Sequence, residues 1–234
     1  MASLVDTGYL SSAKAAEMLG VSQHQVAMLA KREEFSSTKV GGTLLIDPYS
    51  LQFYLNMREG KGRPWNKAVS WGMLWALSGL DPDWLDPQQV QRLGQRIKTI
   101  SARELVWQTR RRSHLRVYQA DESVFDELRG QIFLSGKSTD RPDIFGMPVN
   151  NREIEGYVDA QYLPSYEDAF KLKAATTGNV LIHVYEDQPW PVLAPFKQMP
   201  VAVVAADLAA SLDPRESHAG IAALEILIGG MRSI

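Results

Sequence analysis

The stretch Leu10–Ile46, LSSAKAAEMLGVSQHQVAMLAKREEFSSTKVGGTLLI, limits the possible folds of this chain more than any other. A helix is expected to begin near Ser12, which can cap it, and three of its apolar residues share one face: Ala15, Ala16 and Leu19. Gly20 follows, at a position where the end of a helix commonly needs a left-handed residue. Ser22 can then cap a second helix, Gln23–Lys31, because its hydroxyl accepts from a free N–H of the first turn.

A β-hairpin is predicted directly after these two helices. Gly41 and Gly42 stand between the runs Thr38–Val40 and Thr43–Leu45, and two central glycines are a strong signal for a two-residue hairpin. A third helix over Tyr49–Met57 has apolar residues spaced to pack back on the unit. Two helices followed by a hairpin predict a winged helix-turn-helix in which the hairpin is the wing.

The outward face of the second helix carries the residues that we expect to contact DNA. A recognition helix presents side chains to base edges in the major groove, where glutamine can pair with adenine and methionine can touch the thymine methyl group. The candidates on this helix are Ser22, Gln23, His24, Gln25, Met28 and Lys31. Arg32, at its end, is a candidate phosphate contact. The candidates in the wing are Lys39, Gly41, Gly42 and Thr43.

The order A-A-x-x-L-G-V-S-x-x-x-V, followed by a glycine hairpin and a further helix, resembles the excisionase and MerR-type winged fold. The resemblance covers the first quarter of the chain and implies binding to double-stranded DNA. The alternative is a helical hairpin that binds a protein or only packs within the fold.

Charge is distributed unevenly along the chain, although the formal net charge is only −2. Residues 1–112 carry 15 Lys and Arg against 10 Asp and Glu, whereas residues 113–234 carry 10 against 17. A front half of +5 and a back half of −7 fit a protein that places one part on phosphates and holds the other away from them. Residues 1–64 reach only +1, so we expect modest affinity unless a homodimer doubles the contacts.

The composition limits where in the cell this protein is expected and which kinds of disulfide or metal site it can form. The chain has no cysteine, so neither a disulfide framework nor a thiolate metal site can form. Its first residues, MASLVDTGYL, lack the basic and apolar regions of a signal peptide. No run of about 18 apolar residues is present, as a membrane-spanning helix would require. We therefore expect a cytoplasmic protein without membrane contact and without a cofactor.

Patterning predicts an α+β protein in three parts. Residues 1–62 form the winged helix-turn-helix, and residues 63–112 read as a helical connector in which apolar residues recur every three or four positions. From residue 113 onward strands with alternating or continuous apolar residues are interleaved with helices. Residues 113–234 therefore form a small mixed α/β domain.

Two basic segments have an open role. The segment Arg58–Pro64 reads as a linker in which Lys61 and Arg63 either grip a phosphate or lie in a solvated loop. The run Arg110–Arg112 either contacts phosphates, RNA or a partner protein, or forms a solvated helix end, and such runs are more often the latter.

The back half resembles the C-terminal region of the AbiEi-type antitoxins of type IV toxin–antitoxin operons, which act in abortive infection, a form of phage defence. Four stretches carry the resemblance: residues 115–117 with 132–136, LRV and IFLSG; residues 156–160, GYVDA; residues 179–184, NVLIHV, followed by Trp190-Pro191; and residues 200–227, with the pattern D-L-x-x-S-x-D-P-R-x-x-x-A-G-x-x-x-L. Together with the wing, the resemblance covers two-thirds of the chain.

This resemblance implies a transcriptional repressor that binds inverted repeats in its own promoter and regulates its operon. It also implies that the C-terminal part supplies the antitoxin function against a nucleotidyltransferase toxin, which need not be bound directly. The N-terminal unit departs from the winged helix usual in that family, so the DNA-contacting positions are taken from this sequence alone.

The sequence offers little for catalysis, and we expect no catalytic residue and no metal site. The four histidines are scattered, and we expect His183, in a strand, to be a core or edge residue. Glu155 and Asp159 share one face of a strand and could bind Mg²⁺ in a nuclease, but a solvated strand face is the more common arrangement. The resemblance to the antitoxin family therefore implies an autoregulating antitoxin. The alternatives are a protein-interaction module and a Mg²⁺-dependent nucleic-acid-processing enzyme.

Overall fold

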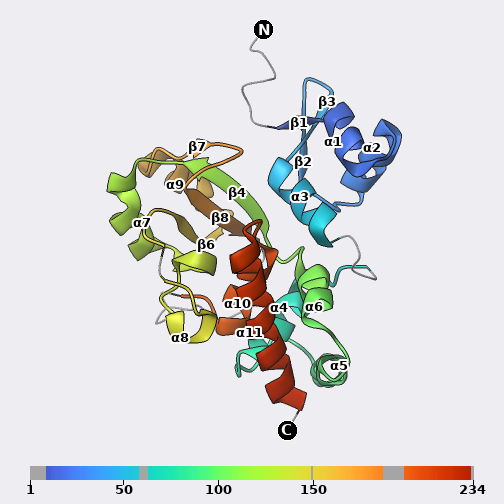
Figure 1. Cartoon of the computed structure of the whole chain (residues 1–234), viewed down its shortest axis with the longest axis vertical. Helices are drawn as coiled ribbons and strands as arrows, with labels where there is room; N and C mark the ends of the chain where they lie inside the picture. The colour runs from blue at the N-terminus through green and yellow to red at the C-terminus, as the bar shows by residue number, and fades with distance from the viewer. Residues whose placement is uncertain (1–8, 58–62, 149, 187–197, 233–234) are drawn as a thin grey trace.

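A computed structural model of the chain describes residues 9–57, 63–148, 150–186 and 198–232, and shows a mixed α+β fold with two sheets (Figure 1). Of the segment Arg58–Pro64, only Arg63 and Pro64 lie within the described residues, so Lys61 and most of the predicted linker lie outside them. Trp190-Pro191 lies outside them as well.

The N-terminal unit consists of β1 (Leu10–Ser11), α1 (Ser12–Leu19), α2 (Gln23–Lys31), β2 (Ser37–Val40), β3 (Thr43–Ile46) and α3 (Pro48–Met57). The cap of α1 is Ser11 rather than Ser12, because Ser11 is extended and its hydroxyl accepts from the N–H of Lys14. Gly20 ends α1 at φ 69°, and its N–H donates to the last turn of the helix. Whether this unit is a winged helix-turn-helix stays a prediction.

The three strands of this unit form one antiparallel sheet in the order β1-β3-β2. Gly41 and Gly42 both have positive φ, 56° and 83°, as a tight turn between β2 and β3 requires. A small core joins sheet and helices, and its fully buried members are Ala15, Val26, Ile46 and Leu51.

A five-stranded sheet with the order β5-β6-β8-β4-β7 organises the rest of the chain. Its strands are β4 (His114–Gln119), β5 (Phe133–Leu134), β6 (Ile154–Asp159), β7 (Lys173–Ala174) and β8 (Val180–Tyr185). The central pair, β6 and β8, is parallel, and every other pair is antiparallel. Since β6 and β8 are buried along nearly their whole length, both faces of the sheet must be covered.

One face of the sheet is covered by α7 (Phe125–Gln131) and α9 (Leu163–Ala169). Alternate residues of the central strands point into this layer: Ile154 and Val158 from β6, and Val180, Ile182 and Val184 from β8. They meet Phe125 and Leu128 of α7. Shorter elements connect this part: η2 (Glu122–Val124), η3 (Gly136–Ser138) and α8 (Pro142–Phe145).

The opposite face is covered by α4 (Lys67–Leu77), α5 (Pro87–Ile97), α6 (Ala102–Thr109), α10 (Val201–Ala210) and α11 (Pro214–Arg232). These helices share one hydrophobic core with Tyr157 of β6 and Tyr185 of β8. The predicted connector, residues 63–112, thus packs together with the last two helices of the chain (Figure 1). The division into three domains stays a prediction.

The helices α10 and α11 form an antiparallel pair, and Gly220 explains how closely they approach. A Cβ atom at this position would collide with the backbone of α10 at Ala205 and Ala209. At the far end of α11, Arg232 donates to the carbonyl groups of Ile97 and Ile100, at distances of 3.0 and 2.6 Å. No helix in the described ranges combines the length and the apolar composition needed to cross a membrane.

Tyr54 of α3 joins the N-terminal unit to the rest of the fold. Its ring packs against Phe35, at 5.7 Å between ring centroids, and against Trp107 of α6, at 5.8 Å. Phe35 belongs to the small N-terminal core and Trp107 to the large central one. The ring of Tyr54 therefore connects the two cores, and Phe53 and Met57 of the same helix also pack into the central one.

Candidate nucleic-acid interface and buried polar cluster

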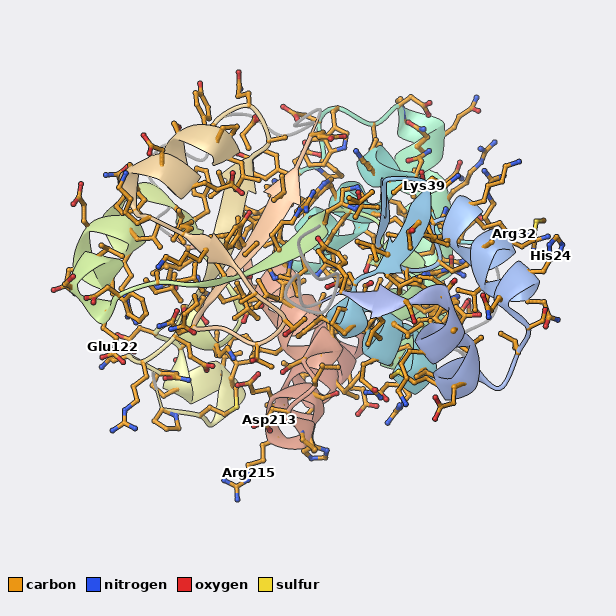
Figure 2. All side chains as sticks on the ribbon, turned by 90° about the horizontal axis from the view of Figure 1, so that it is seen from above. His24, Arg32, Lys39, Glu122, Asp213 and Arg215 are labelled. Atoms are coloured by element: carbon orange, nitrogen blue, oxygen red, sulfur yellow. The ribbon has the colours of Figure 1, made fainter. Side chains whose placement is uncertain are left out.

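The outward face of α2 is exposed to solvent, whereas its inward face is buried. Val26 and Ala30 face the small core. The predicted base-contacting residues all lie in solvent: Ser22, Gln23, His24, Gln25, Met28 and Lys31. Met28 is 41% exposed, which leaves a large apolar side chain uncovered on an otherwise polar face. His24, Arg32 and Lys39 all lie at the end of the molecule that the N-terminal unit forms, and Glu122 lies at the opposite end (Figure 2).

Some of these residues also build the helix itself. Ser22 and Gln25 form a reciprocal capping box, in which the Ser22 hydroxyl accepts from the N–H of Gln25 and the Gln25 side chain accepts from the N–H of Ser22. The Ser12 hydroxyl donates to the side-chain oxygen Oε1 of Gln23 at 3.4 Å. Because the Oε1 atom of Gln25 is committed to the cap, its Nε2 group is the part that remains for an outside contact.

The wing residues are exposed together with the whole of β2. Lys39, Gly41, Gly42 and Thr43 all face solvent at the end of the hairpin. Lys39 forms no ion pair with any other described residue. The structure thus places the two groups of predicted DNA contacts on one unit, and their contact with DNA stays a prediction.

The run Arg110–Arg112 is not the solvated helix end that such runs usually form. Arg110 donates to a carboxylate oxygen of Glu34 at 2.5 Å, and its guanidinium lies 3.5 Å from the centre of the Trp107 ring. Arg111 donates to the carbonyl oxygen of Arg32, at the end of α2. The solvated-end expectation is wrong because Glu34 and the chain end of α2 come within reach only when the N-terminal unit folds onto α6.

Arg112 points the other way, into a buried polar cluster between the sheet and α10. Asp207 of α10 accepts from Arg112, from the Tyr157 hydroxyl at 2.9 Å and from the Ser135 hydroxyl. Burial raises the pKa of Tyr157 well above its usual value, so Tyr157 remains a phenol that can donate to Asp207. All four side chains are buried.

The second half of this cluster is the pair Glu155 and His183. His183 Nε2 lies 2.9 Å from a Glu155 carboxylate oxygen and 3.8 Å from Asp207, and its ring stacks on Tyr157 at 4.7 Å. The expected solvated strand face is therefore wrong for Glu155, which is 6% exposed. His183 is buried, as expected for a core residue of β8. Asp159, at the end of β6, accepts from the N–H of Gln161 instead of joining Glu155.

The buried polar cluster is assembled from segments that lie far apart in the sequence. Ser135 precedes η3, Tyr157 lies in β6, His183 lies in β8 and Asp207 lies in α10. The cluster was not predicted as a unit, because its members come from separate strands and helices. One signal was available: four polar residues stand inside strongly apolar or strand-like segments, where burial without a partner is costly.

The cluster is closed to solvent, and within the described ranges no group of three or more His, Asp or Glu side chains is placed to hold a metal ion. What the cluster does is fasten the end of α6, the strands β6 and β8, and α10 to one another through charge-assisted hydrogen bonds.

Comparison of the chain with protein-family models, with curated proteins and with solved structures finds no match in any of the three.

Proposed function

We propose that this protein is a DNA-binding transcriptional repressor whose N-terminal unit acts as a winged helix-turn-helix. The observation that carries the proposal is the outward face of α2, where Gln23, His24, Met28 and Lys31 are exposed while Val26 and Ala30 anchor the helix in the core. An exposed methionine beside glutamine and lysine offers an apolar contact for a thymine methyl group and donors for bases and phosphates.

Two copies of the chain would place two α2 helices in successive major grooves of an inverted repeat, with the β2–β3 hairpins on the flanking backbone. By the AbiEi resemblance, the repeat lies in the promoter of the protein's own operon. The same resemblance assigns the remaining function, that of an antitoxin that counters a nucleotidyltransferase without needing to bind it.

The test is fluorescence anisotropy of the full chain on its own upstream DNA and on a scrambled duplex, at two salt concentrations. We expect tighter binding to the upstream duplex, weakening as salt rises. Equal affinity for both duplexes would contradict sequence-specific repression. The antitoxin part is tested separately, by co-expression with the product of the neighbouring gene: growth rescued by the wild-type chain supports it, and continued arrest overturns it.

Replacing Gln23 by Ala should weaken binding to the upstream duplex by about 1–3 kcal/mol and relax preference at one base position. The matched control is Gln95→Ala on α5, an exposed glutamine at a distance from the N-terminal unit, which should bind as the wild type does. If Gln23→Ala weakened binding to every duplex equally, Gln23 would contact the DNA backbone and would not recognise a base.

One observation favours a second candidate, a protein-interaction module. Glu33 and Glu34 follow α2 closely and pair with Arg110 and Arg111, which leaves few free cations for phosphates. Binding of the neighbouring gene product that is insensitive to salt, together with no preference for any duplex, would support this candidate over the repressor.

A further inference from the structure

A groove with a volume of about 1180 Å³ lies between the N-terminal unit and the edge of the five-stranded sheet. One wall is the end of α2 with Ser36–Thr38, and the other is β4 with Ala174–Thr176. The segment Arg63–Lys67 and the pair Arg110 and Arg111 line it as well. The proposed DNA surface does not account for this groove, which has the size of a ligand site.

Positive charge slightly exceeds negative charge among the described residues that line this groove, where six cationic side chains face five carboxylates: Glu33, Glu34, Asp47, Glu167 and Glu186. The six cationic side chains are Lys31, Arg63, Lys67, Arg110, Arg111 and Arg116. Lys67 pairs with Glu186 at 3.0 Å, and Arg110 and Arg111 pair with Glu33 and Glu34. Within the described residues, no carboxylate lies within ion-pair distance of the other three: Lys31, Arg63 and Arg116.

The other acidic side chains of the groove already have hydrogen-bond donors. A carboxylate oxygen of Asp47 accepts from the N–H of Ser50 at 2.7 Å, and Glu167 accepts from the Tyr118 hydroxyl at 2.6 Å. Desolvation by burial is the largest cause that lowers the pKa of His114; Lys67 and Arg116 act in the same direction, and Glu186 and Glu33 act against it.

The edge of β4 adds backbone N–H and C=O groups to the same wall of the groove. The pairing of β7 with β4 is confined to Tyr118 and Gln119, with one further bond from Ala175 to Val117. In the described part of the chain, no strand therefore covers this edge of β4 at His114–Arg116. The wall across the groove is lined by Ser36, Ser37 and Thr38. Cations without a carboxylate partner, beside open backbone groups, suit a ligand with several acceptor oxygens.

We propose that this groove binds a small anion that carries two or more phosphoryl groups, held by Arg116 and Arg63 with Lys31. The planar fork of arginine matches the geometry of phosphoryl oxygens, and two arginines from distant segments converge on one groove only in the folded protein.

Binding in this groove is linked to the position of α2. Arg111 lies 3.8 Å from Glu34 and 3.9 Å from Glu33, which are long ion pairs that a phosphoryl group can replace. An anion in the groove would then compete with the end of α2 for Arg111 and change the DNA affinity. This consequence rests on the proposed function, whereas binding of the anion does not.

The test is isothermal titration of the full chain, without DNA, with inorganic tripolyphosphate and with ATP. Citrate, a carboxylate polyanion, and a ten-nucleotide single strand are titrated for comparison. We expect tripolyphosphate and ATP to bind, with affinity reduced about tenfold in Arg116→Gln and in Arg63→Gln, as expected for loss of one charge-assisted contact. The matched control is Arg152→Gln, an exposed arginine outside the groove, which should bind as the wild type does.

Amide spectra by NMR give a second readout, in which tripolyphosphate should shift the signals of residues 36–38 and 114–117. The proposal is overturned if neither phosphate compound binds, if Arg152→Gln weakens binding as much as Arg116→Gln, or if citrate binds as tightly as tripolyphosphate. Tighter binding of the single strand than of ATP would also overturn it, in favour of a nucleic-acid groove. Because the titrations with tripolyphosphate and ATP contain no DNA, failure of these compounds to bind and failure of the repressor proposal are separate results.

Discussion

Asp207 shows how one buried charge can hold several elements together. Its carboxylate is fully buried on α10 and accepts from Arg112, Tyr157 and Ser135, which come from the end of α6, from β6 and from the residue before η3. A carboxylate removed from water is tolerated only when it is paired and hydrogen-bonded. The four elements are therefore fixed by the geometry of a single side chain.

Replacing Asp207 by Ala should lower the free energy of unfolding by about 3–5 kcal/mol, because Arg112 would be left buried without its partner. Urea unfolding followed by tryptophan fluorescence measures this loss. Asp213→Ala is the control: Asp213 is exposed and accepts from the N–H of Arg215 at the start of α11, so its loss should cost about 1 kcal/mol. Equal losses in the two variants would show that the cluster does not stabilise the fold in this way.

Gly136 is required by the same cluster. Its φ is +50°, and a Cβ atom at this position would collide with the carboxylate of Glu155. Gly136→Ala should therefore destabilise the protein by about 1–3 kcal/mol. Gly130→Ala is the control, since Gly130 lies exposed in α7 with open space around it, and alanine there should stabilise the helix by about 0.5–1 kcal/mol. Thermal unfolding of both variants distinguishes the two effects by sign.

At the scale of elements, the arginine run couples α2 to α6. Arg110 stacks on Trp107 and pairs with Glu34, and both charged side chains are largely buried. The adjacent Arg112 enters the polar cluster on the other side. Three consecutive residues therefore link the N-terminal unit to the sheet and α10.

A double-mutant cycle on Arg110→Ala and Glu34→Ala should give a coupling energy of about 1–3 kcal/mol, measured by urea unfolding. The pair Lys171 and Asp168 provides the comparison: it lies at 2.9 Å on the surface with both side chains strongly exposed, so its coupling should be about 0.5 kcal/mol or less. A coupling for Arg110 and Glu34 as small as that of the surface pair would mean that the run does not join the two parts energetically.

At the scale of the whole molecule, the distribution of free charge decides how strongly DNA binding depends on salt. The acidic excess lies in residues 113–234, and two of the basic residues of the front half, Arg110 and Arg111, are already paired. On the N-terminal unit, Lys31, Arg32 and Lys39 are exposed and have no ion-pair partner among the described residues. Three cations per copy are a small set for binding a polyanion.

The logarithm of the DNA association constant should therefore fall with the logarithm of salt concentration with a slope of about −3 for one copy and about −5 for a dimer. Anisotropy titrations at four salt concentrations measure this slope. A slope near −10 would show that further cations reach the DNA, such as Arg63 or the arginine run.

Local order was largely predictable because short-range rules determine it. The capping serine of α2, the left-handed Gly20 and the Gly41-Gly42 turn each depend on backbone groups within a few residues. The strands β6 and β8 were likewise predictable from their composition. The exposure of the α2 face follows from helical spacing, since the position of each side chain around a helix is determined by its number.

The burial and the pairing of the charged side chains depend on the tertiary fold. Neither the burial of Glu155 nor the pairing of Arg110 with Glu34, 76 positions away, can be read from neighbours in the chain. A charge is tolerated inside a protein when its partner arrives from elsewhere in the fold, so the partner's position is the deciding fact. The amino-acid pattern alone predicts the longer helices and the strands β4, β6 and β8, but not the short elements β1, β7 and α8, which depend on pairing and packing with distant segments. The packing of α4–α6 with α10 and α11, and the groove beside β4, arose from contacts between distant segments.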